Sequence, residues 1–528
     1  MNKIAVYLNR QIRGNVYDKP SILKAYSSDR SILEIKPRFV AVPETTDDIR
    51  KLCRFINQLA VKDYKLPIAV RGSGLDATGA DLTSGLVIST ERLNKIKEID
   101  AHDRLVHVQA GVTLGELNSA LASHGLILPV NSDPRETIGG LIANASTDSY
   151  AFRFGGIMNY VDRIETVLAS GDIFQTSRFG QRGFSRRKAM TNIQGTIYRD
   201  LNRLLGDHQS TIESLRGTRN TAGYPAIQYV SRDNGRVFDP LPVFFGSQGT
   251  LGIISEVILR AELIPPKPTH LVVVFNSFRL ANDFLAFAKK LRPLELDFYD
   301  LNILKVAEEH GKRPDFFNHI GSEGYLVYLT FCDKYRINRR KVERCLEYLP
   351  KSARYATESD KDVNFSSIFN ILSSYLNGDA NNERTPFVSD FYVPADELVN
   401  FVSDLHYLEE KYKIPLSIYG SYGTSIYSIR PNVQISSESG RRFIVDFLTD
   451  FNKLLKMHYG YLCGGSPEGR IKALLTNREL NVAEKKLYHA LKDTFDPNHI
   501  LAPDIKLGAD PRSVARHFRT SENTTIMV

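Results

Sequence analysis

The chain has 528 residues, of which 42% are hydrophobic and 24% charged, and its formal net charge is +8. This length exceeds what one hydrophobic core usually serves, so we expect two or more domains. The composition is ordinary for a soluble globular protein, and a charge of this size, spread over the whole chain, gives little support to nucleic-acid binding.

The four cysteines, Cys53, Cys332, Cys345 and Cys463, lie far apart in the sequence. They form no CxxC spacing, which argues against an iron–sulfur cluster or a structural zinc site, and their small number suits a reducing compartment. The N-terminus is polar and lacks the apolar run of a signal peptide, and no uncharged stretch has transmembrane length. We therefore expect a cytoplasmic protein with at most peripheral membrane contact.

The first third of the chain predicts strands joined by a glycine-rich loop. Residues 38–43 form a predicted strand, and a helix capped near Thr45 follows it. The next strand, 67–71, continues into the loop 71–81, RGSGLDATGAD, and a further strand follows at 86–89. A Rossmann fingerprint needs a long helix directly after its glycines, so we reject that motif here.

The stretch 129–145, PVNSDPRETIGGLIANA, packs small residues together after a predicted strand at 105–110 and a helix at 113–125. Gly139 and Gly140 let backbone N–H groups approach a ligand closely, because no Cβ stands in the way. Consecutive amides in such a turn can bind an anion. The alternative is a tight turn packed under a core helix. Beyond it we predict a hairpin at 161–176 and an irregular, basic stretch at 178–235.

The proline cluster 265–268 interrupts the pattern and marks the best domain boundary. Strands and helices alternate after it, and residues 510–528 have the composition of a loose tail. The predicted strands are 271–275, 325–331, 387–394 and a segment near 426–430, and the predicted helices are 279–291, 299–310, 337–348, 395–412, 439–458 and 479–495.

Five blocks, in order and spacing, match a known family: PRFVAVP, RGSGLDATGA, GVTLGELNSALASHGLILP, TIGGLIANA and FFGSQGTLGIISEVILR. They resemble the PCMH-type FAD-binding domain of the vanillyl-alcohol-oxidase-like flavoproteins, and most of all the D-lactate dehydrogenase, glycolate oxidase and D-2-hydroxyglutarate dehydrogenase group. The resemblance implies an α+β fold with two lobes. It implies an FAD-binding domain (1–265), a cap or substrate domain with an antiparallel sheet flanked by helices (266–465), a C-terminal segment returning to the FAD domain (466–510) and a tail (511–528).

The resemblance also implies where FAD binds. The loop after the second strand would wrap the pyrophosphate, the TIGGLIANA segment would lie along the ribityl chain, and the strand after the last glycine motif would lie beside the adenine. Relatives that hold flavin covalently have a histidine where this chain has Leu75, so we expect non-covalent FAD. The implied cofactor-binding residues are Arg71, Gly72, Ser73, Gly74, Leu75, Asp76, Pro129, Ser132, Asp133, Thr137, Ile138, Gly139, Gly140, Ala143, Asn144, Ala145, Gly252, Ile253 and Ile254.

The metal and base positions of the family's cap domain differ in this chain. Ser421 and Ser428 stand where the first family motif has histidines, and Ser466 stands at the histidine of its Glu-His pair. Serine hydroxyls are poor zinc ligands and, without a partner, poor bases, so we expect no metal. The remaining candidates for catalysis are Tyr422, Tyr427, Arg430 and Arg470. For the tyrosines, packing against neighbouring strands is at least as good an explanation.

The leading functional hypothesis is an FAD-dependent oxidoreductase that acts on the CH–OH group of an alcohol or hydroxy acid without a metal. Its electron acceptor is open, with oxygen, a quinone or a protein as the choices. One alternative is a D-lactate or glycolate type of dehydrogenase with a rearranged site. Another is a non-catalytic flavin-binding subunit.

Overall fold

The structure is a computed structural model, and it describes residues 2–232, 235–302, 315–317, 323–358, 360, 365, 368, 388–431 and 438–519. The chain divides into two compact units. Unit 1 comprises Met1–Ser146, Ile157–Leu263 and Ser466–Arg519, and unit 2 comprises Thr147–Gly156, Ile264–Gly465 and Thr520–Val528.

Unit 1 contains a four-stranded sheet in the order β1 (Asn15–Tyr17), β2 (Phe39–Val42), β4 (Leu86–Ser89) and β3 (Ile68–Arg71). The strands β2, β4 and β3 run parallel, and β1 pairs antiparallel with β2. All four residues of β2 and of β4 are buried, as expected for parallel strands covered on both faces.

A second sheet of unit 1 is antiparallel, in the order β5 (Ile96–Asp100), β6 (Leu105–Gln109), β13 (Ile253–Arg260), β8 (Val161–Val167) and β9 (Ile173–Gln175). The predicted hairpin at 161–176 is confirmed, since β8 and β9 pair antiparallel. Two short ladders accompany the sheets: β10 (Phe179–Gly180) with β12 (Val237–Phe238) and β11 (Ser231–Arg232), and β14 (Glu262–Leu263) with β7 (Leu126–Ile127).

Several helices of unit 1 begin at capping side chains. Thr45 and Asp48 form a capping box at α3, and Thr113 and Glu116 form one at α4, which satisfies amides that have no partner inside the helix. The helices are α1 (Lys3–Gln11), α2 (Pro20–Ala25), α3 (Thr46–Val61), α4 (Leu114–Ala122), α5 (Ile138–Asn144), α7 (Gln181–Lys188), α8 (Ile193–Asp207), α9 (Gln209–Ser214), α16 (Ala473–Glu479), α17 (Val482–Phe495) and α18 (Pro511–Arg516).

The stretch 178–235, expected to be irregular, contains α7, α8 and α9. The helix α8 starts at Asn192, whose side chain accepts a hydrogen bond from the Gly195 amide, and it buries Ile197, Leu201 and Leu204. These residues are spaced so that they lie on one face of a helix. The expectation of irregular structure was wrong because the many basic residues of the stretch obscured this apolar spacing.

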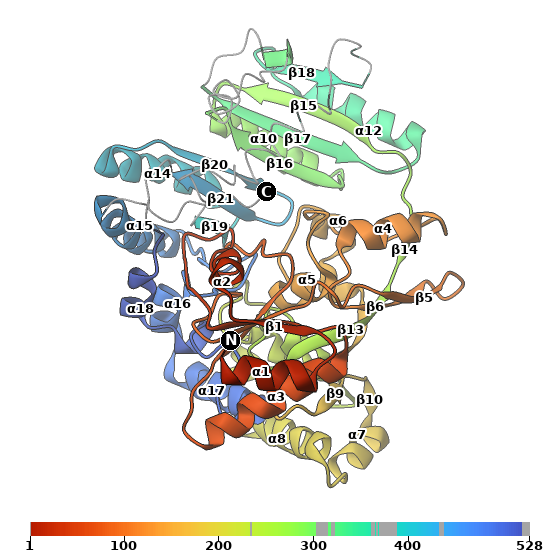
Figure 1. Ribbon diagram of the computed structural model, residues 1–528. Helices are drawn as coiled ribbons and strands as arrows, with labels where there is room; N and C mark the ends of the chain where they lie inside the picture. The colour runs from red at the N-terminus through yellow and green to blue at the C-terminus, as the bar shows by residue number, and fades with distance from the viewer. Residues whose placement is uncertain are drawn as a thin grey trace. The chain divides into compact units, whose positions relative to one another are not determined.

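Unit 2 is built on one seven-stranded sheet (Figure 1). Each hydrogen-bonded pair of its strands is antiparallel. The order is β18 (Arg354–Thr357), β15 (Thr269–Phe275), β17 (Tyr325–Phe331), β16 (Glu295–Asp300), β20 (Leu416–Ser421), β21 (Ile426–Pro431) and β19 (Val388–Tyr392), and the helices are α6 (Ala151–Phe154), α10 (Phe278–Lys289), α12 (Tyr335–Tyr348), α14 (Leu398–Tyr412) and α15 (Glu438–Met457).

One face of this sheet is apolar and packs on helices. Phe298 of β16 lies 5.2 Å, between ring centroids, from Phe278 of α10. Phe391 of β19 lies 5.6 Å from Phe401 of α14 and 5.1 Å from Phe451 of α15. The α+β class, with helices flanking an antiparallel cap sheet, is therefore confirmed.

One expected helix of unit 2 was wrong at its start. The sequence predicted a helix at 299–310, but residues 295–300 form the strand β16, and 303–310 lie outside the described residues. The predicted strand 387–394 is found as β19, and its first residue lies outside the described residues.

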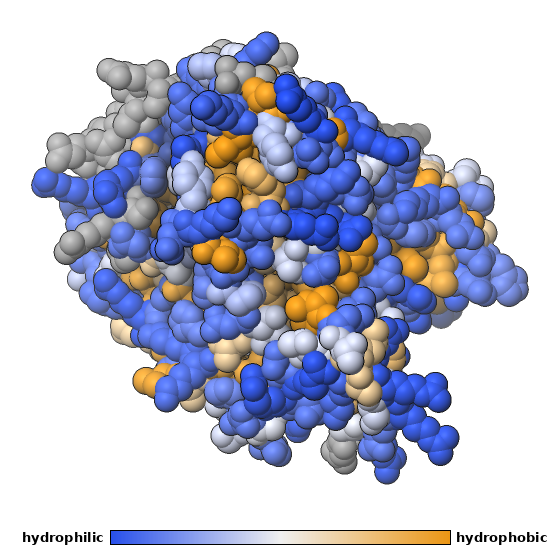
Figure 2. Space-filling model, turned by 60° about the horizontal axis from the view of Figure 1, so that its bottom comes forward, coloured by the Kyte–Doolittle hydropathy of each residue, from blue (hydrophilic) through white to orange (hydrophobic). Residues whose placement is uncertain are grey.

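The surface carries mostly hydrophilic residues on the face that Figure 2 shows, with hydrophobic residues in small groups between them. Among the described helices, none combines the length and the low charge that crossing a lipid bilayer requires.

Candidate functional site

The glycine loop, residues 72–76, leaves β3 at its carboxyl end in unit 1. The backbone amides of Ser73, Gly74 and Leu75 donate no hydrogen bond to any described residue. Gly74 has φ +71°, and a Cβ at this position would lie 2.2 Å from a guanidinium nitrogen of Arg71, so only glycine fits without strain. The loop therefore presents consecutive backbone donors, the arrangement that binds phosphate oxygens.

The helix α5 faces the glycine loop with small residues. Thr137 caps it by accepting a hydrogen bond from the Gly140 amide at 3.3 Å. A Cβ on Gly139 would lie 2.8 Å from the Cβ of Ala110, and one on Gly72 would lie 2.2 Å from the Thr137 hydroxyl oxygen. The glycines thus allow the helix, the loop and the end of β6 to pack closely while leaving space beside them.

These elements line a pocket within unit 1 whose empty space, including the part open to solvent, is about 910 Å³. Its lining residues are Val70, Gly72, Ser73, Gly74, Leu75, Asp76, Ala80, Asp81, Thr90, Ala110, Glu136, Thr137, Gly139, Gly140, Leu141, Ala143, Asn144, Ser146, Gln248, Gly249, Gly252, Ile253 and Ile254. Amide donors at one part and small or aliphatic side chains elsewhere fit a dinucleotide such as FAD.

Most of the expected cofactor residues line this pocket, but six do not: Arg71, Pro129, Ser132, Asp133, Ile138 and Ala145. The Arg71 guanidinium is buried and donates to the Ser28 carbonyl at 2.8 Å. Asp133 accepts from Arg30 and Arg135, each at 2.8 Å. Burial by itself raises the pKa of Asp133, but these hydrogen bonds outweigh it and lower the pKa below its ordinary value.

The other four residues outside the lining have local structural contacts. Ser132 donates to the Glu136 carboxylate at 2.7 Å. Ile138 is completely buried, and Ala145 ends α5 in a left-handed conformation with φ 47°. Pro129 lies between β7 and α5. Whether these residues contact the cofactor stays a prediction.

Gln248 joins three segments at the pocket wall. Its side-chain nitrogen donates to the Thr78 hydroxyl at 3.1 Å and to the Asn144 carbonyl oxygen at 3.4 Å, and its carbonyl accepts from the Gly469 amide at 3.0 Å. Sequence reasoning did not include Gln248 among the cofactor-binding residues. The pocket residues Thr90 and Ala110 were missed, because each lies just past the end of a strand and is identified only once the sheets are assembled.

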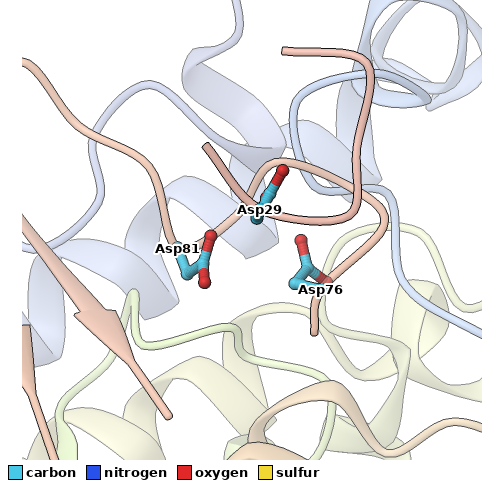
Figure 3. Close-up of side chains that lie close together, drawn as sticks. All are labelled: Asp29, Asp76 and Asp81. Atoms are coloured by element: carbon cyan, nitrogen blue, oxygen red, sulfur yellow. The ribbon is translucent and has the colours of Figure 1, made fainter. Parts of the chain in front are cut away.

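Three carboxylates, Asp29, Asp76 and Asp81, form an acid triad beside the glycine loop, with one oxygen of each within 4.8 Å of the others (Figure 3). Burial and then the charge of Asp81 raise the pKa of Asp29 well above its ordinary value. Burial and then Asp29 raise the pKa of Asp76 to about 6. Burial, followed by mutual repulsion, therefore raises the pKa of these carboxyl groups above that of isolated carboxylates.

The second region of interest is the polar face of the unit 2 sheet, on the opposite side from the helix-packed phenylalanines. Side chains alternate along β16, so Glu295, Asp297 and Tyr299 share this face. Asp297 is paired directly with Ser421 of β20, and Tyr419 with Ser428 of β21. Ser421 and Ser428, which are expected at histidine positions of the family, therefore both lie on the polar face.

Two of the expected catalytic candidates lie beside the unit 2 sheet in different settings. Tyr422 directly follows β20; its amide donates to the Leu296 carbonyl at 2.8 Å, and its ring centroid lies 5.3 Å from the Lys289 ammonium. Tyr427 is completely buried on the helix-packed face, 5.6 Å from the ring of Phe298.

The two arginine candidates do not share one unit. Arg430 lies at the end of β21, paired with Ser417 on the polar face. Arg470 belongs to unit 1, where its buried guanidinium donates to the carbonyls of Gly79 and Leu82 at 3.1 and 2.7 Å. These contacts give Arg470 a structural role in holding the segment that follows the glycine loop.

Two protein-family models match the chain. Residues 37–177 match the FAD binding domain, and residues 264–505 match the C-terminal domain of FAD linked oxidases. The chain carries the two domains of the FAD-linked oxidase family. The first match includes the glycine loop and α5, and the second includes all seven strands of the unit 2 sheet.

Curated relatives agree with this family. D-2-hydroxyglutarate dehydrogenase of Pseudomonas putida is 24% identical, over 94% of this chain and 50% of the relative. Glycolate oxidase subunit GlcD of Bacillus subtilis is 24% identical, over 90% of each chain. The chain spans about half the length of the first of these relatives and of two other D-2-hydroxyglutarate dehydrogenases that it matches.

A solved structure shows the same fold as this FAD-linked oxidase. The 4-ethylphenol oxidase from Gulosibacter chungangensis aligns with a TM-score of 0.67 over 96% of this chain and 97% of that protein, at 15% sequence identity. The PCMH-type fold is thus confirmed. At 15% identity the similarity concerns the fold alone.

Proposed function

We propose that this FAD-linked oxidase uses non-covalent FAD, held in the unit 1 pocket, to oxidise the CH–OH group of an alcohol or hydroxy acid. The observation that carries the proposal is the pocket itself, in which the unpaired amides of Ser73, Gly74 and Leu75 stand beside the glycines of α5. Bound FAD supplies the two-electron acceptor for this oxidation.

The residues of the pocket have separable tasks in this proposal. The loop amides bind the pyrophosphate, and the small residues of α5 admit the cofactor. Leu75 lines the pocket where covalent relatives have histidine. A hydrocarbon side chain forms no bond to flavin, so the cofactor is held by contacts alone.

We propose that the reaction needs no metal. Ser421 and Ser428 occupy the polar face where the family has imidazoles. The Ser466 hydroxyl accepts a hydrogen bond from Lys472 at 3.0 Å. A neutral hydroxyl is a weak ligand for a divalent cation, and the Ser466 hydroxyl of unit 1 is already bound to an ammonium group.

Purification and anaerobic reduction test this function. The purified protein should be yellow and should release FAD into the supernatant on denaturation. An anaerobic screen of alcohols, sugars and hydroxy acids should then find a compound that bleaches the flavin, and a chelator should leave that rate unchanged. A colourless protein that cannot be reconstituted with FAD contradicts the cofactor assignment. Bound FAD that no compound of the panel reduces favours a non-catalytic flavin-binding subunit.

The relatives favour a second candidate, a 2-hydroxy-acid dehydrogenase with a rearranged site. It predicts rapid bleaching by D-2-hydroxyglutarate, D-lactate or glycolate in the same screen. The electron acceptor would be oxygen, a quinone or a protein in either case. We place the protein in the cytoplasm, which is supported by four buried cysteines that form no disulfide.

A further inference from the structure

Nearly all of the chain's net positive charge lies in one segment of unit 1. Residues 178–236 contain eleven arginines and lysines but only four aspartates and glutamates, so this segment carries a net charge of +7 out of the chain's +8. Its first part, residues 178–199, contains six basic residues and no acidic residue. A surface on which charge of one sign is concentrated attracts partners of the opposite sign.

The structure brings the basic residues of this segment onto adjoining elements. The helix α7 packs against α8 and against β10 and β12, and α7 lies beside α8 in Figure 1. The Arg199 guanidinium of α8 donates to the Lys188 carbonyl of α7 at 2.6 Å. Arg232 of β11 and Gly180, which directly precedes α7, are both paired with Val237 of β12. We call the resulting surface the basic patch, and its residues are Arg182, Arg186, Arg187, Lys188, Arg199 and Arg232.

The charges of the basic patch are not neutralised by the part of the chain that the structure describes. No residue of the patch forms an ion pair with a described carboxylate, whereas the nearby Arg178 is paired with Asp239 at 3.3 Å. Arg182 and Arg186 are exposed and lie one helical turn apart, where like charges repel each other. An anionic partner would remove this repulsion.

The aromatic rings beside the patch do not favour a nucleic acid as that partner. The ring of Phe179 lies under the Arg187 guanidinium at 5.1 Å, and the ring of Phe184 lies under the Lys188 ammonium at 4.7 Å. Phe184 also stacks on Phe238, with 3.9 Å between ring centroids. Proteins that bind single-stranded nucleic acid offer rings on which bases stack, but these rings are already engaged within the protein.

Exposed apolar side chains border the basic patch. Ile193, the first residue of α8, is 36% exposed, and Tyr229 is 43% exposed. Arg187 donates to the Gln194 side chain at 3.4 Å and Arg232 to the Tyr229 carbonyl at 3.1 Å, so both apolar groups adjoin basic residues. Basic residues together with exposed aliphatic and aromatic groups are typical of a surface that lies on a lipid bilayer.

We propose that the basic patch docks unit 1 on the surface of an anionic lipid bilayer. Lipid phosphates accept paired hydrogen bonds from arginine, and each basic residue near an anionic surface strengthens binding about fivefold. The exposed apolar groups enter the headgroup region beside the phosphates. A bilayer also contains quinones, one class of electron acceptor open to the proposed reaction, but the docking does not depend on that reaction.

Binding of the full-length protein to lipid vesicles tests the proposal. Vesicles of equal parts phosphatidylcholine and phosphatidylglycerol are compared with vesicles of phosphatidylcholine alone, and the protein that floats with each is measured. We expect binding to the anionic vesicles to be stronger by at least about tenfold at about 0.1 M salt. The difference should disappear at about 1 M salt, where the screening length falls from about 10 Å to about 3 Å.

A double variant connects this binding to the patch. Arg182→Gln with Arg186→Gln removes two exposed charges and should weaken binding to the anionic vesicles about 25-fold, at about fivefold for each charge. The melting temperature should not fall, because neither arginine forms an ion pair with a described residue. Arg336→Gln with Arg340→Gln is the matched control, since these exposed arginines have the same spacing on α12 of unit 2. This control should retain the binding of the wild type.

A variant of the apolar border separates the two kinds of contact. Ile193→Ser should weaken binding to the anionic vesicles several-fold and leave its dependence on salt unchanged, because no charge is removed. Absence of binding to anionic vesicles at low salt overturns the proposal. Equal losses in the two double variants also overturn it, because binding would then follow from net charge alone.

A nucleic acid is the other partner that the experiment distinguishes. Tighter binding to a single-stranded DNA oligonucleotide than to the anionic vesicles, at the same salt concentration, overturns the lipid assignment. None of these measurements depends on flavin reduction, so the docking surface and the proposed oxidation can fail separately.

Discussion

The pocket of unit 1 and the polar face of unit 2 are built in different ways. The pocket offers backbone amides that any sequence has, and its identity depends on the glycines that let those amides be reached. The polar face offers side chains such as Asp297 and Ser421 on a regular sheet. A single substitution on a strand exchanges one functional group for another while the ladder hydrogen bonds stay the same.

Replacing a loop glycine disturbs the backbone, whereas a strand side chain can be exchanged without disturbing the pairing of β20 with β21. The expectation that Ser421 and Ser428 stand at histidine positions of the family is of this second kind. A site made of backbone amides should therefore lose ligand binding when a small increase in side-chain volume blocks those amides. A site made of side chains should lose binding when a charged group is removed. The predictions below test that distinction.

The largest effect is expected from Gly74→Ala. An alanine at this position must adopt φ +71°, and its methyl group meets the Arg71 guanidinium. That guanidinium is fixed by its hydrogen bond to the Ser28 carbonyl. The strain of about 1–3 kcal/mol for a non-glycine residue in this conformation should lower FAD affinity by roughly 10–100-fold. The ratio of flavin absorbance to protein absorbance after dialysis measures how much FAD the variant retains. Gly206→Ala, in an exposed turn of α8 with no atom within 4 Å of the new Cβ, is the control and should retain full flavin.

Neighbouring glycines of α5 should give opposite results when each is replaced by alanine. The Cβ of Gly139→Ala would lie 2.8 Å from Ala110 inside the protein, so the apoprotein should lose about 1–3 kcal/mol of stability through overpacking. The Cβ of Gly140→Ala meets only the Thr137 hydroxyl, at 3.0 Å. It should leave the apoprotein stable and weaken FAD by up to about tenfold through the occupied space. Melting temperatures measured with and without FAD distinguish the stability effect of Gly139→Ala from the binding effect of Gly140→Ala. Equal melting temperatures of the two apoprotein variants would contradict this prediction.

FAD affinity should fall as the pH rises through about 6, where Asp76 loses its proton. The pKa of Asp76 is raised in the fold from 3.8, so its contribution to stability is full below that value and is lost as the pH rises through about 6. Deprotonation also adds negative charge beside the phosphates. Fluorescence titrations of FAD between pH 5 and 8 should show the decline, at most about tenfold per pH unit for each coupled proton. Asp76→Asn should remove this dependence of FAD affinity on pH. Asp207→Asn, at an exposed position, is the control and should leave the dependence unchanged.

The sequence predicted the parts of the pocket that are contiguous in the chain. The glycine loop, α5 and the start of β13 were each marked by local glycine patterns. Thr90 and Ala110 were not, because they reach the pocket only through the pairing of strands. Such residues have no local signal, since their neighbours in sequence are ordinary strand residues.

The strand β16 shows why the polar face was harder to predict. Glu295, Asp297 and Tyr299 alternate with Leu296 and Phe298, which is the pattern of a strand with one polar, solvated face. All five residues are nevertheless buried, so the acidic side chains lie where apolar residues are expected. Local consistency fails in this way at functional sites, and the misplaced helix prediction at 299–310 had the same origin.

The smallest effect is expected from Tyr427→Phe, and it tests the two faces of the sheet against each other. On the helix-packed face, the buried Tyr427 hydroxyl has no hydrogen-bond partner among the described residues, so removing it should change stability by no more than about 1 kcal/mol. The rate of flavin reduction should stay as in the wild type. Loss of reduction with an unchanged melt would instead make Tyr427 a residue that touches substrate. The functional surface would then have to include the face that packs on Phe298 and Phe391.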